Sequence, residues 1–240
     1  MVSPNANSDP SPLSALPVAR AGPSPRSAGV ATVLLHGRGR TPMEMLALAE
    51  RLSLPGMPFL ALTAAGGTWY PESFLAARER NEPHLGWALD RVEAVVRGLE
   101  GEGVPRERIA LVGFSQGACL AAEYVFRRPG RWGALVALTG GLIGPAGTSW
   151  TSDASLGGTP VLLTGSDVDE WVPLARVKET ADVFRAMGAE VRLRACPGRS
   201  HLVSDDEVRA AHAELALLLG KTDLGTAEEA RPGAGLEDAR

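Results

Sequence analysis

The chain has 240 residues, of which 45% are hydrophobic and 22% charged, and its formal net charge at pH 7 is −4. Such a length and hydrophobic content are enough for one folded α/β domain with a full core. The acidic balance, without any long basic run, argues against nucleic-acid binding and favours a neutral or small-molecule ligand.

Membrane and metal signals are also missing from the sequence. No apolar stretch approaches the ~18 residues of a membrane-spanning helix, so no stable membrane insertion is expected. The N-terminus lacks the basic start and apolar core of a secretory signal. The two cysteines, Cys119 and Cys196, have no zinc-ligand spacing. We therefore expect a soluble, cytoplasmic protein with neither a metal ion nor another cofactor.

The two ends of the chain differ in composition from its middle. Residues 1–27 are rich in Pro, Ser and Ala, which offer little apolar area to bury, and they predict a flexible arm. Within this arm, "LPVAR" (16–20) is a candidate short edge strand. Residues 221–240 have the same character and predict a disordered tail. The folded domain is therefore expected over residues 28–220.

Short apolar runs recur through this domain and predict strands. Most are apolar almost throughout, as expected where both faces of a sheet are covered. They lie at residues 30–35, 58–62, 108–112, 134–138, 160–164 and 190–194.

Helical patterns separate these runs. Thr41 and Glu44 form a capping box with Pro42 at the first helical position, and Ser204 and Glu207 form another. Between residues 84 and 100, apolar residues recur on one helical face. Alternating strands and helices predict an α/β fold with a mostly parallel central sheet flanked by helices. No internal repeat and no large lid insertion are evident.

The stretch "GFSQGACL" (113–120) follows the third predicted strand and opens a helix. This is the strand, sharp turn and helix that a nucleophile elbow requires, and it makes Ser115 a candidate nucleophile. The glycines at 113 and 117 fit a turn that is too tight for side chains. Cys119, one helical turn further on, is interpreted as a small core residue.

A serine hydroxyl needs a base to remove its proton, and the chain has four histidines. His36 and His84 precede Ser115, against the hydrolase order of nucleophile, acid and base, and His212 lies inside a periodic helix. His201 follows the last predicted strand and is the candidate base. Asp167 and Asp169, after the strand at 160–164, are both candidates for the carboxylate that orients it, and spacing does not choose between them.

Acyl transfer also needs hydrogen-bond donors for the oxyanion. The backbone N–H of Gln116, directly after the nucleophile, is one candidate. The glycine-rich turn "HGRGR" (36–40) follows the first core strand and supplies the backbone N–H of Arg38 as the other.

Six segments in order resemble the phospholipase/carboxylesterase family of α/β-hydrolases, which includes acyl-protein thioesterases. They are "LLHGRGRT", "GTWYPESF", "NEPHL", "IALVGFSQGACLAAEYVFRRPGRWGALVALTGGLIG", "GSDVDEWVP" and "PGRSH". The resemblance implies an α/β-hydrolase fold and a cofactor-free serine esterase or thioesterase that acts on a small-molecule ester.

Position by position, the resemblance assigns the nucleophile to Ser115, the base to His201 and the acid to Asp169. The family has a proline directly after the acid, where this chain has Glu170, so Asp167 stays open as the acid. The resemblance also suggests that Trp69 and Tyr70 line the acyl pocket, while simple packing beneath a loop is the other interpretation. Trp171 is expected either to wall the site or to cap the following helix.

Two other functions remain open from the sequence. One is a ligand-binding protein without catalysis on the same scaffold, and the other is transfer of the acyl group to an acceptor other than water. Only a short segment separates the strands at 134–138 and 160–164. We therefore expect a shallow pocket suited to short acyl chains.

Overall fold

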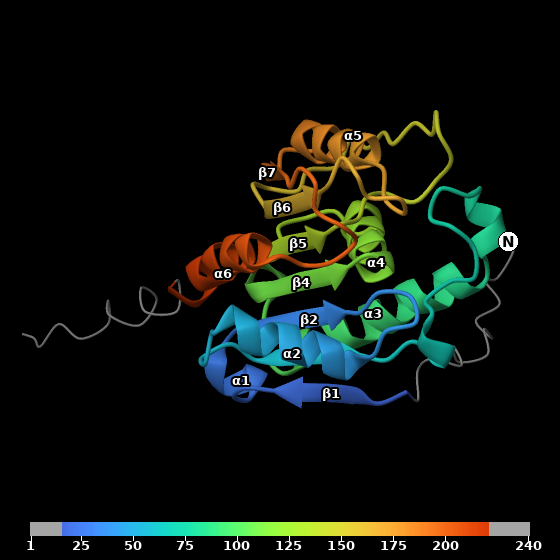
Figure 1. Cartoon of the computed structure of the whole chain (residues 1–240). Coiled ribbons are helices and arrows are strands. Elements are labelled where there is room, and N and C mark those ends of the chain that lie inside the picture. Colours follow the sequence, from blue (N-terminus) through green and yellow to red (C-terminus); the bar gives the residue numbers. More distant parts are fainter. Residues whose placement is uncertain (1–15, 221–240) are drawn as a thin grey trace, which may run out of the picture.

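The computed structural model describes residues 16–220 of the chain (Figure 1). The strands are β1 (Val18–Ala21), β2 (Ala31–Leu35), β3 (Phe59–Leu62), β4 (Ile109–Phe114), β5 (Ala134–Leu138), β6 (Pro160–Gly165) and β7 (Glu190–Ala195). The α-helices are α1 (Pro25–Ala28), α2 (Pro42–Leu52), α3 (His84–Gly101), α4 (Gln116–Arg127), α5 (Leu174–Ala186) and α6 (Asp205–Gly220). Short 3-10 helices span Ala65–Gly67, Arg78–Asn81 and Arg106–Arg108.

The strands form one sheet in the order β1-β3-β2-β4-β5-β6-β7. All neighbours pair in parallel except β1, which runs antiparallel to β3 at the edge. The mostly parallel sheet predicted from the apolar runs is confirmed, and so is the edge strand in "LPVAR". The folded domain was expected to begin at residue 28, but β1 and α1 precede this position. The folded unit therefore includes the last part of the expected flexible arm. Residues 1–15 and 221–240 of the expected arm and tail lie outside the described residues.

Helices cover both faces of the sheet (Figure 1). Side chains of α2 and α6 share one buried cluster with strand residues such as Leu34 and Val112. Side chains of α3, α4 and α5 share the other with the adjacent strand residues, such as Val33 and Leu111. Successive side chains of a strand point to opposite faces, so each central strand contributes to both clusters and must be apolar throughout.

The carboxyl ends of the parallel strands meet at one edge of the sheet. The turns after β2, β4 and β6 and the loop after β7 therefore converge there, as expected for sites of open α/β sheets. The segment between β5 and β6 contains no helix or strand, so no lid domain is inserted at this point. Within residues 16–220, no helix is both long and apolar enough to cross a membrane.

Candidate active site

Ser115 lies on the sharp turn between β4 and α4, with φ 55° and ψ −118°. Non-glycine residues rarely adopt such a conformation, and its cost is about 1–3 kcal/mol. A Cβ on Gly113 would lie 2.3 Å from the Gly117 carbonyl oxygen, and one on Gly117 would lie 2.1 Å from the Leu35 carbonyl oxygen. The close approach of strand and helix thus requires glycine at both positions, as the sequence indicated.

His201 joins Ser115 to Asp169. Its Nε2 lies 2.8 Å from Ser115 Oγ, and its Nδ1 lies 2.8 Å from Asp169 Oδ2. Asp167 does not reach the imidazole. Its Oδ1 accepts a 2.8 Å hydrogen bond from the backbone N–H of Gly198, in the turn that leads to His201. Of the two carboxylates that the sequence left open, the structure brings Asp169 to the histidine.

The side chain of Asp169 is fully buried and strongly hydrogen bonded. Its Oδ1 accepts 2.9 Å hydrogen bonds from the backbone N–H groups of Trp171 and Val172. Burial raises the pKa of this carboxyl, but these N–H donors and His201 outweigh burial and hold the pKa below its usual value. Asp169 is therefore ionised at neutral pH, as a carboxylate that orients an imidazole must be.

The two expected oxyanion donors belong to segments that adjoin the serine. Gln116 is the first residue of α4, where a backbone N–H has no acceptor within the helix. The turn after β2 passes close to the serine, since a Cβ on Gly37 would lie 3.3 Å from Ser115 Cβ. The guanidinium of Arg38 donates 2.7 Å hydrogen bonds to the carbonyls of Pro71 and Glu72 and so ties this turn to the loop at 68–74.

The side chain of Gln116 has a role that sequence analysis missed. Its Oε1 accepts a 3.1 Å hydrogen bond from the Trp69 N–H, and its Nε2 donates a 2.8 Å hydrogen bond to the Tyr70 carbonyl. The residue is 6% exposed. Gln116 therefore fixes the 68–70 loop to the start of α4. Because this contact joins segments that are distant in the chain, no local sequence pattern predicts it.

The two aromatic residues for which the sequence left pocket lining and packing open are both buried. Trp69 and Tyr70 are each 1% exposed and belong to the hydrophobic core. Trp69 Nε1 donates a 2.8 Å hydrogen bond to the His36 carbonyl. Both rings pack beneath the loop, in agreement with the second of the two interpretations that the sequence left open.

Of the two roles expected for Trp171, the structure excludes only that of helix cap. The residue is 65% exposed, and its backbone N–H is the group that contacts Asp169. Pro173, not Trp171, is the N-cap residue of α5. The indole therefore projects into solvent next to the acid.

The remaining histidine near the site, His36, supports the turn after β2. Its Nδ1 lies 2.8 Å from the Gly37 carbonyl oxygen, and its Nε2 accepts a 3.2 Å hydrogen bond from the Ala64 N–H. Burial lowers the pKa of His36, although the hydrogen bond to Gly37 acts in the opposite direction. A neutral ring with its proton on Nδ1 satisfies both contacts.

Cys119 is 1% exposed, and burial raises the pKa of its thiol to about 12. The thiol is therefore protonated and unreactive, in agreement with a core residue. Within residues 16–220, no group of three or more His, Cys, Asp or Glu side chains is placed to hold a metal ion.

A groove of about 330 Å³ lies beside the serine, between α2 and the loop that carries His201. Gly37, Phe114 and Leu202 line it next to Ser115 and His201, and Ala47 and Leu48 of α2 line it further out. The exposed surface of the groove is mostly apolar, with charged residues of α2 at its rim. It is open to solvent, and three of its lining residues, Phe114, Leu202 and Val203, lie within two positions of Ser115 or His201 in the chain.

The sheet, the elbow and the converging loops define an α/β-hydrolase. A sequence profile of the phospholipase/carboxylesterase family matches residues 23–219, and the chain belongs to this family. It is therefore a hydrolase of the esterase and thioesterase type.

Three relatives illustrate the similarity. A phospholipase/carboxylesterase from Dyadobacter fermentans has a crystal structure that superposes with a TM-score of 0.80 at 36% identity, covering 84% of this chain and 97% of that one. Acyl-protein thioesterase 1 homolog 1 of Dictyostelium discoideum is 28% identical, covering 66% of this chain and 72% of its own length. A probable carboxylesterase of Oryza sativa subsp. japonica is 26% identical, covering 73% and 82%.

Proposed function

We propose that the protein is a serine hydrolase that cleaves small carboxylic esters or thioesters through an acyl-enzyme on Ser115. The observation that carries this proposal is the unbroken chain of two 2.8 Å hydrogen bonds from Ser115 through His201 to Asp169. A binding protein without catalysis has no need for a strained serine joined to a histidine and a buried carboxylate.

In the first half of the reaction, Ser115 Oγ attacks the carbonyl carbon while His201 Nε2 takes the hydroxyl proton. Asp169 keeps the other imidazole proton on Nδ1 and stabilises the imidazolium. The backbone N–H groups of Arg38 and Gln116 donate hydrogen bonds to the oxyanion of the tetrahedral intermediate. The intermediate collapses, and the leaving alcohol or thiol takes the proton from His201.

In the second half, water attacks the carbonyl carbon of the acyl-enzyme while His201 Nε2 takes one of its protons. The new tetrahedral intermediate expels Ser115 Oγ, which regains a proton from His201. The acid product leaves and the free enzyme is restored. Each step uses only groups of this chain and water, so we propose a reaction without a cofactor.

The groove beside the serine suits the leaving alcohol of an apolar ester. Leu202, the residue after His201, lines it, so a substrate lying in the groove places its leaving group next to the proton donor. Its apolar inner wall favours an uncharged alcohol. We expect the acyl group to lie on the opposite side of Ser115 and to be short, because no lid domain is inserted between β5 and β6.

Labelling with a fluorophosphonate probe tests the proposal, because such a probe phosphonylates only a serine activated by its base. We expect peptide mapping to find the label on Ser115, and we expect S115A to lose both labelling and hydrolysis of p-nitrophenyl butyrate. A folded protein that is neither labelled at Ser115 nor able to turn over any p-nitrophenyl ester contradicts the proposal. A ligand-binding function would then be favoured if a compound still raised the melting temperature.

The p-nitrophenyl series from acetate to palmitate tests the short acyl preference, and rates that rise steadily with chain length contradict it. Adding a competing alcohol separates hydrolysis from acyl transfer. We also propose that the protein acts in the cytoplasm. The free thiols Cys119 and Cys196 support a reducing compartment.

A further inference from the structure

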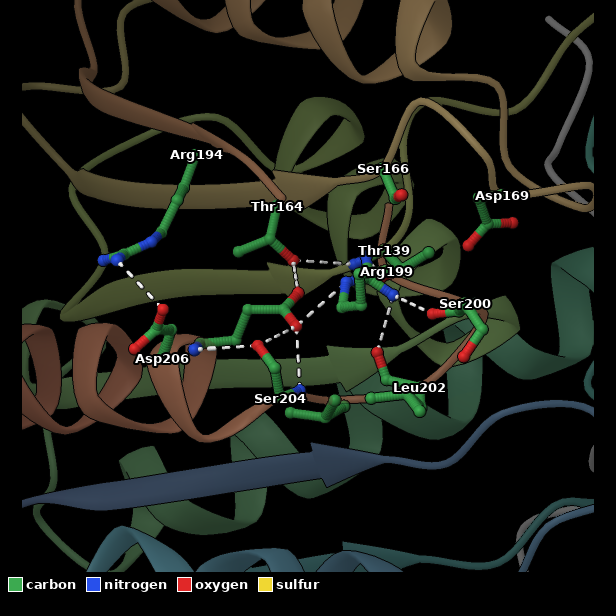
Figure 2. Close-up of polar contacts among 12 residues, drawn as sticks. Thr139, Thr164, Ser166, Asp169, Arg194, Arg199, Ser200, Leu202, Ser204 and Asp206 are labelled. Atoms are coloured by element: carbon green, nitrogen blue, oxygen red, sulfur yellow. Dashed lines mark hydrogen bonds and ion pairs between the residues drawn. The ribbon is translucent and has the colours of Figure 1, made fainter. Parts of the chain in front are cut away.

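A buried ion pair lies at the base of the loop that carries His201. Arg199 is 9% exposed and Glu207 is 0% exposed, and Arg199 Nε lies 3.1 Å from Glu207 Oε2. Arg199 precedes His201 by two residues, and Glu207 lies in the first turn of α6. Figure 2 shows the polar contacts around this pair.

Glu207 is anchored to the rigid part of the fold. Its Oε1 accepts a 2.5 Å hydrogen bond from Thr164 Oγ1 on β6. Its Oε2 accepts hydrogen bonds from the Ser204 N–H and hydroxyl, at 2.9 and 2.8 Å. The capping box predicted at Ser204 is thus present, and the same carboxylate also holds the Arg199 guanidinium.

Arg199 connects Glu207 to the histidine loop, which we define as residues 196–204. Its Nη1 donates hydrogen bonds to the carbonyl oxygens of Ser200 and Leu202, both at 2.7 Å. These are the residues on either side of His201. Its Nη2 donates a 2.7 Å hydrogen bond to Thr139 Oγ1, directly after β5 (Figure 2). One planar guanidinium therefore ties both backbone neighbours of His201 to the ends of two central strands.

Other hydrogen bonds hold the two ends of the histidine loop. The N–H groups of Cys196 and Gly198 donate to the Gly165 carbonyl and to Asp167 Oδ1, and Arg51 donates to the Val203 carbonyl. Residues 196–204 contain no helix or strand. The backbone hydrogen bonds within the loop are short-range, such as Arg199 N–H to the Cys196 carbonyl and Leu202 N–H to the Ser200 carbonyl. Among the hydrogen bonds within residues 16–220, only those of Arg199 connect the carbonyls of Ser200 and Leu202 to the sheet.

We propose that Arg199 and Glu207 are positioning residues that set the place and angle of the His201 imidazole relative to Ser115. This inference rests on the proposed serine hydrolase function. A buried ion pair is weak evidence for stability, because apolar residues of the same volume often stabilise a fold as well. The planar guanidinium, however, directs Nη1 to the two carbonyls, Nη2 to Thr139 and Nε to Glu207 at the same time, which an apolar pair or a single ammonium does not do.

The decisive variant is R199K, with R199M and E207Q beside it. Lysine keeps the positive charge next to Glu207, but its single ammonium lacks the planar fork that holds both carbonyls and Thr139. A displacement of about 1 Å in a catalytic group costs about 10²-fold in rate. We therefore expect R199K to lower kcat for p-nitrophenyl butyrate about 10²-fold, with KM within about threefold of the parent value.

The matched control is the R192M/E214Q double variant. Arg192 on β7 and Glu214 on α6 form a second ion pair that involves α6, and it does not contact the histidine loop. We expect the control to lose stability without a comparable loss of kcat. All rates are measured well below the melting temperature of each variant, so that folded protein is compared with folded protein.

The rate of fluorophosphonate labelling gives a second readout. Labelling depends on the activation of Ser115 by His201, so it should fall in parallel with kcat in R199K. If folded R199K keeps kcat and labelling within threefold of the parent, or if R192M/E214Q loses as much kcat, the positioning role is wrong. If R199M does not fold, R199K and E207Q still decide the question. A parent protein that is neither labelled nor active refutes the proposed function instead.

Discussion

Replacing Asp169 by asparagine tests whether this residue sets the tautomer of His201 in the candidate triad. In the parent, Asp169 Oδ1 accepts hydrogen bonds from the Trp171 and Val172 N–H groups, and Oδ2 faces His201 Nδ1. Asparagine has only one oxygen. If that oxygen took the place of Oδ2, the amide NH₂ would face two N–H donors and leave both without an acceptor, at about 1–3 kcal/mol each.

The favoured orientation therefore keeps the asparagine oxygen on the two N–H groups and turns its NH₂ toward His201. The imidazole must then accept at Nδ1 and carry its proton on Nε2, where it donates to Ser115 instead of accepting the serine proton. The wrong tautomer of a triad histidine costs about 10⁴-fold in kcat, which corresponds to about 5.5 kcal/mol.

The control for D169N is D167N, since an asparagine oxygen at 167 still accepts the hydrogen bond from Gly198. We expect D167N to keep kcat within about threefold of the parent value. Steady-state hydrolysis of p-nitrophenyl butyrate, with unfolding curves for both variants, measures the difference. The reasoning is refuted if D169N keeps kcat within tenfold of the parent, or if D167N loses as much as D169N.

Two further predictions concern the elements that hold the site. G117A should destabilise the protein by about 1–3 kcal/mol or more, because the new methyl group overlaps the Leu35 carbonyl. G98A on α3 should be neutral or stabilising, because its methyl group meets nothing within 4 Å. Thermal unfolding of the two variants checks this difference in stability. Because burial lowers the pKa of His36 below 6.5, the unfolded chain binds the proton first as the pH falls, and the free energy of unfolding should decrease below about pH 6.5. Denaturant titrations at several pH values should show a smaller decrease in H36N, and an equal decrease would contradict the assignment.

Chain order and local pattern were enough to predict the strands, the elbow and the catalytic candidates. Ser115 and His201 each follow an apolar strand, and in a parallel sheet the ends of such strands must meet at one edge. The choice of Asp169 over Asp167 needed the structure, because both residues follow the same strand and differ only in the direction of their side chains.

The contacts that sequence analysis missed join segments far apart in the chain. The side chain of Gln116 binds residues 68–70, and Arg199 binds Thr139, 60 residues away. Glu207 was recognised only as part of a capping box, because that pattern is local while its ion pair is not. The burial of Trp69 and Tyr70 was left open for a related reason: a pair of aromatics in a loop does not indicate which side of the loop faces the core.

The groove yields a prediction about which half of the ester it binds. Ala47 lies on an exposed turn of α2 and lines the groove, so A47W fills it without disturbing the core. For butyrate esters we expect A47W to raise KM steeply as the alcohol grows from methyl to hexyl. For methyl esters of increasing acyl length, the ratio of variant to parent KM should stay constant.

This pattern follows from the position of the groove on the side of His201. In the proposed mechanism that histidine donates its proton to the leaving group, so we expect a groove lined by Leu202 to receive the alcohol and not the acyl chain. If A47W instead discriminates by acyl length and ignores the alcohol, the orientation of the substrate is the reverse of the one proposed. The catalytic roles of Ser115, His201 and Asp169 would be unaffected, because the tetrahedral intermediate contacts them in the same way in either orientation.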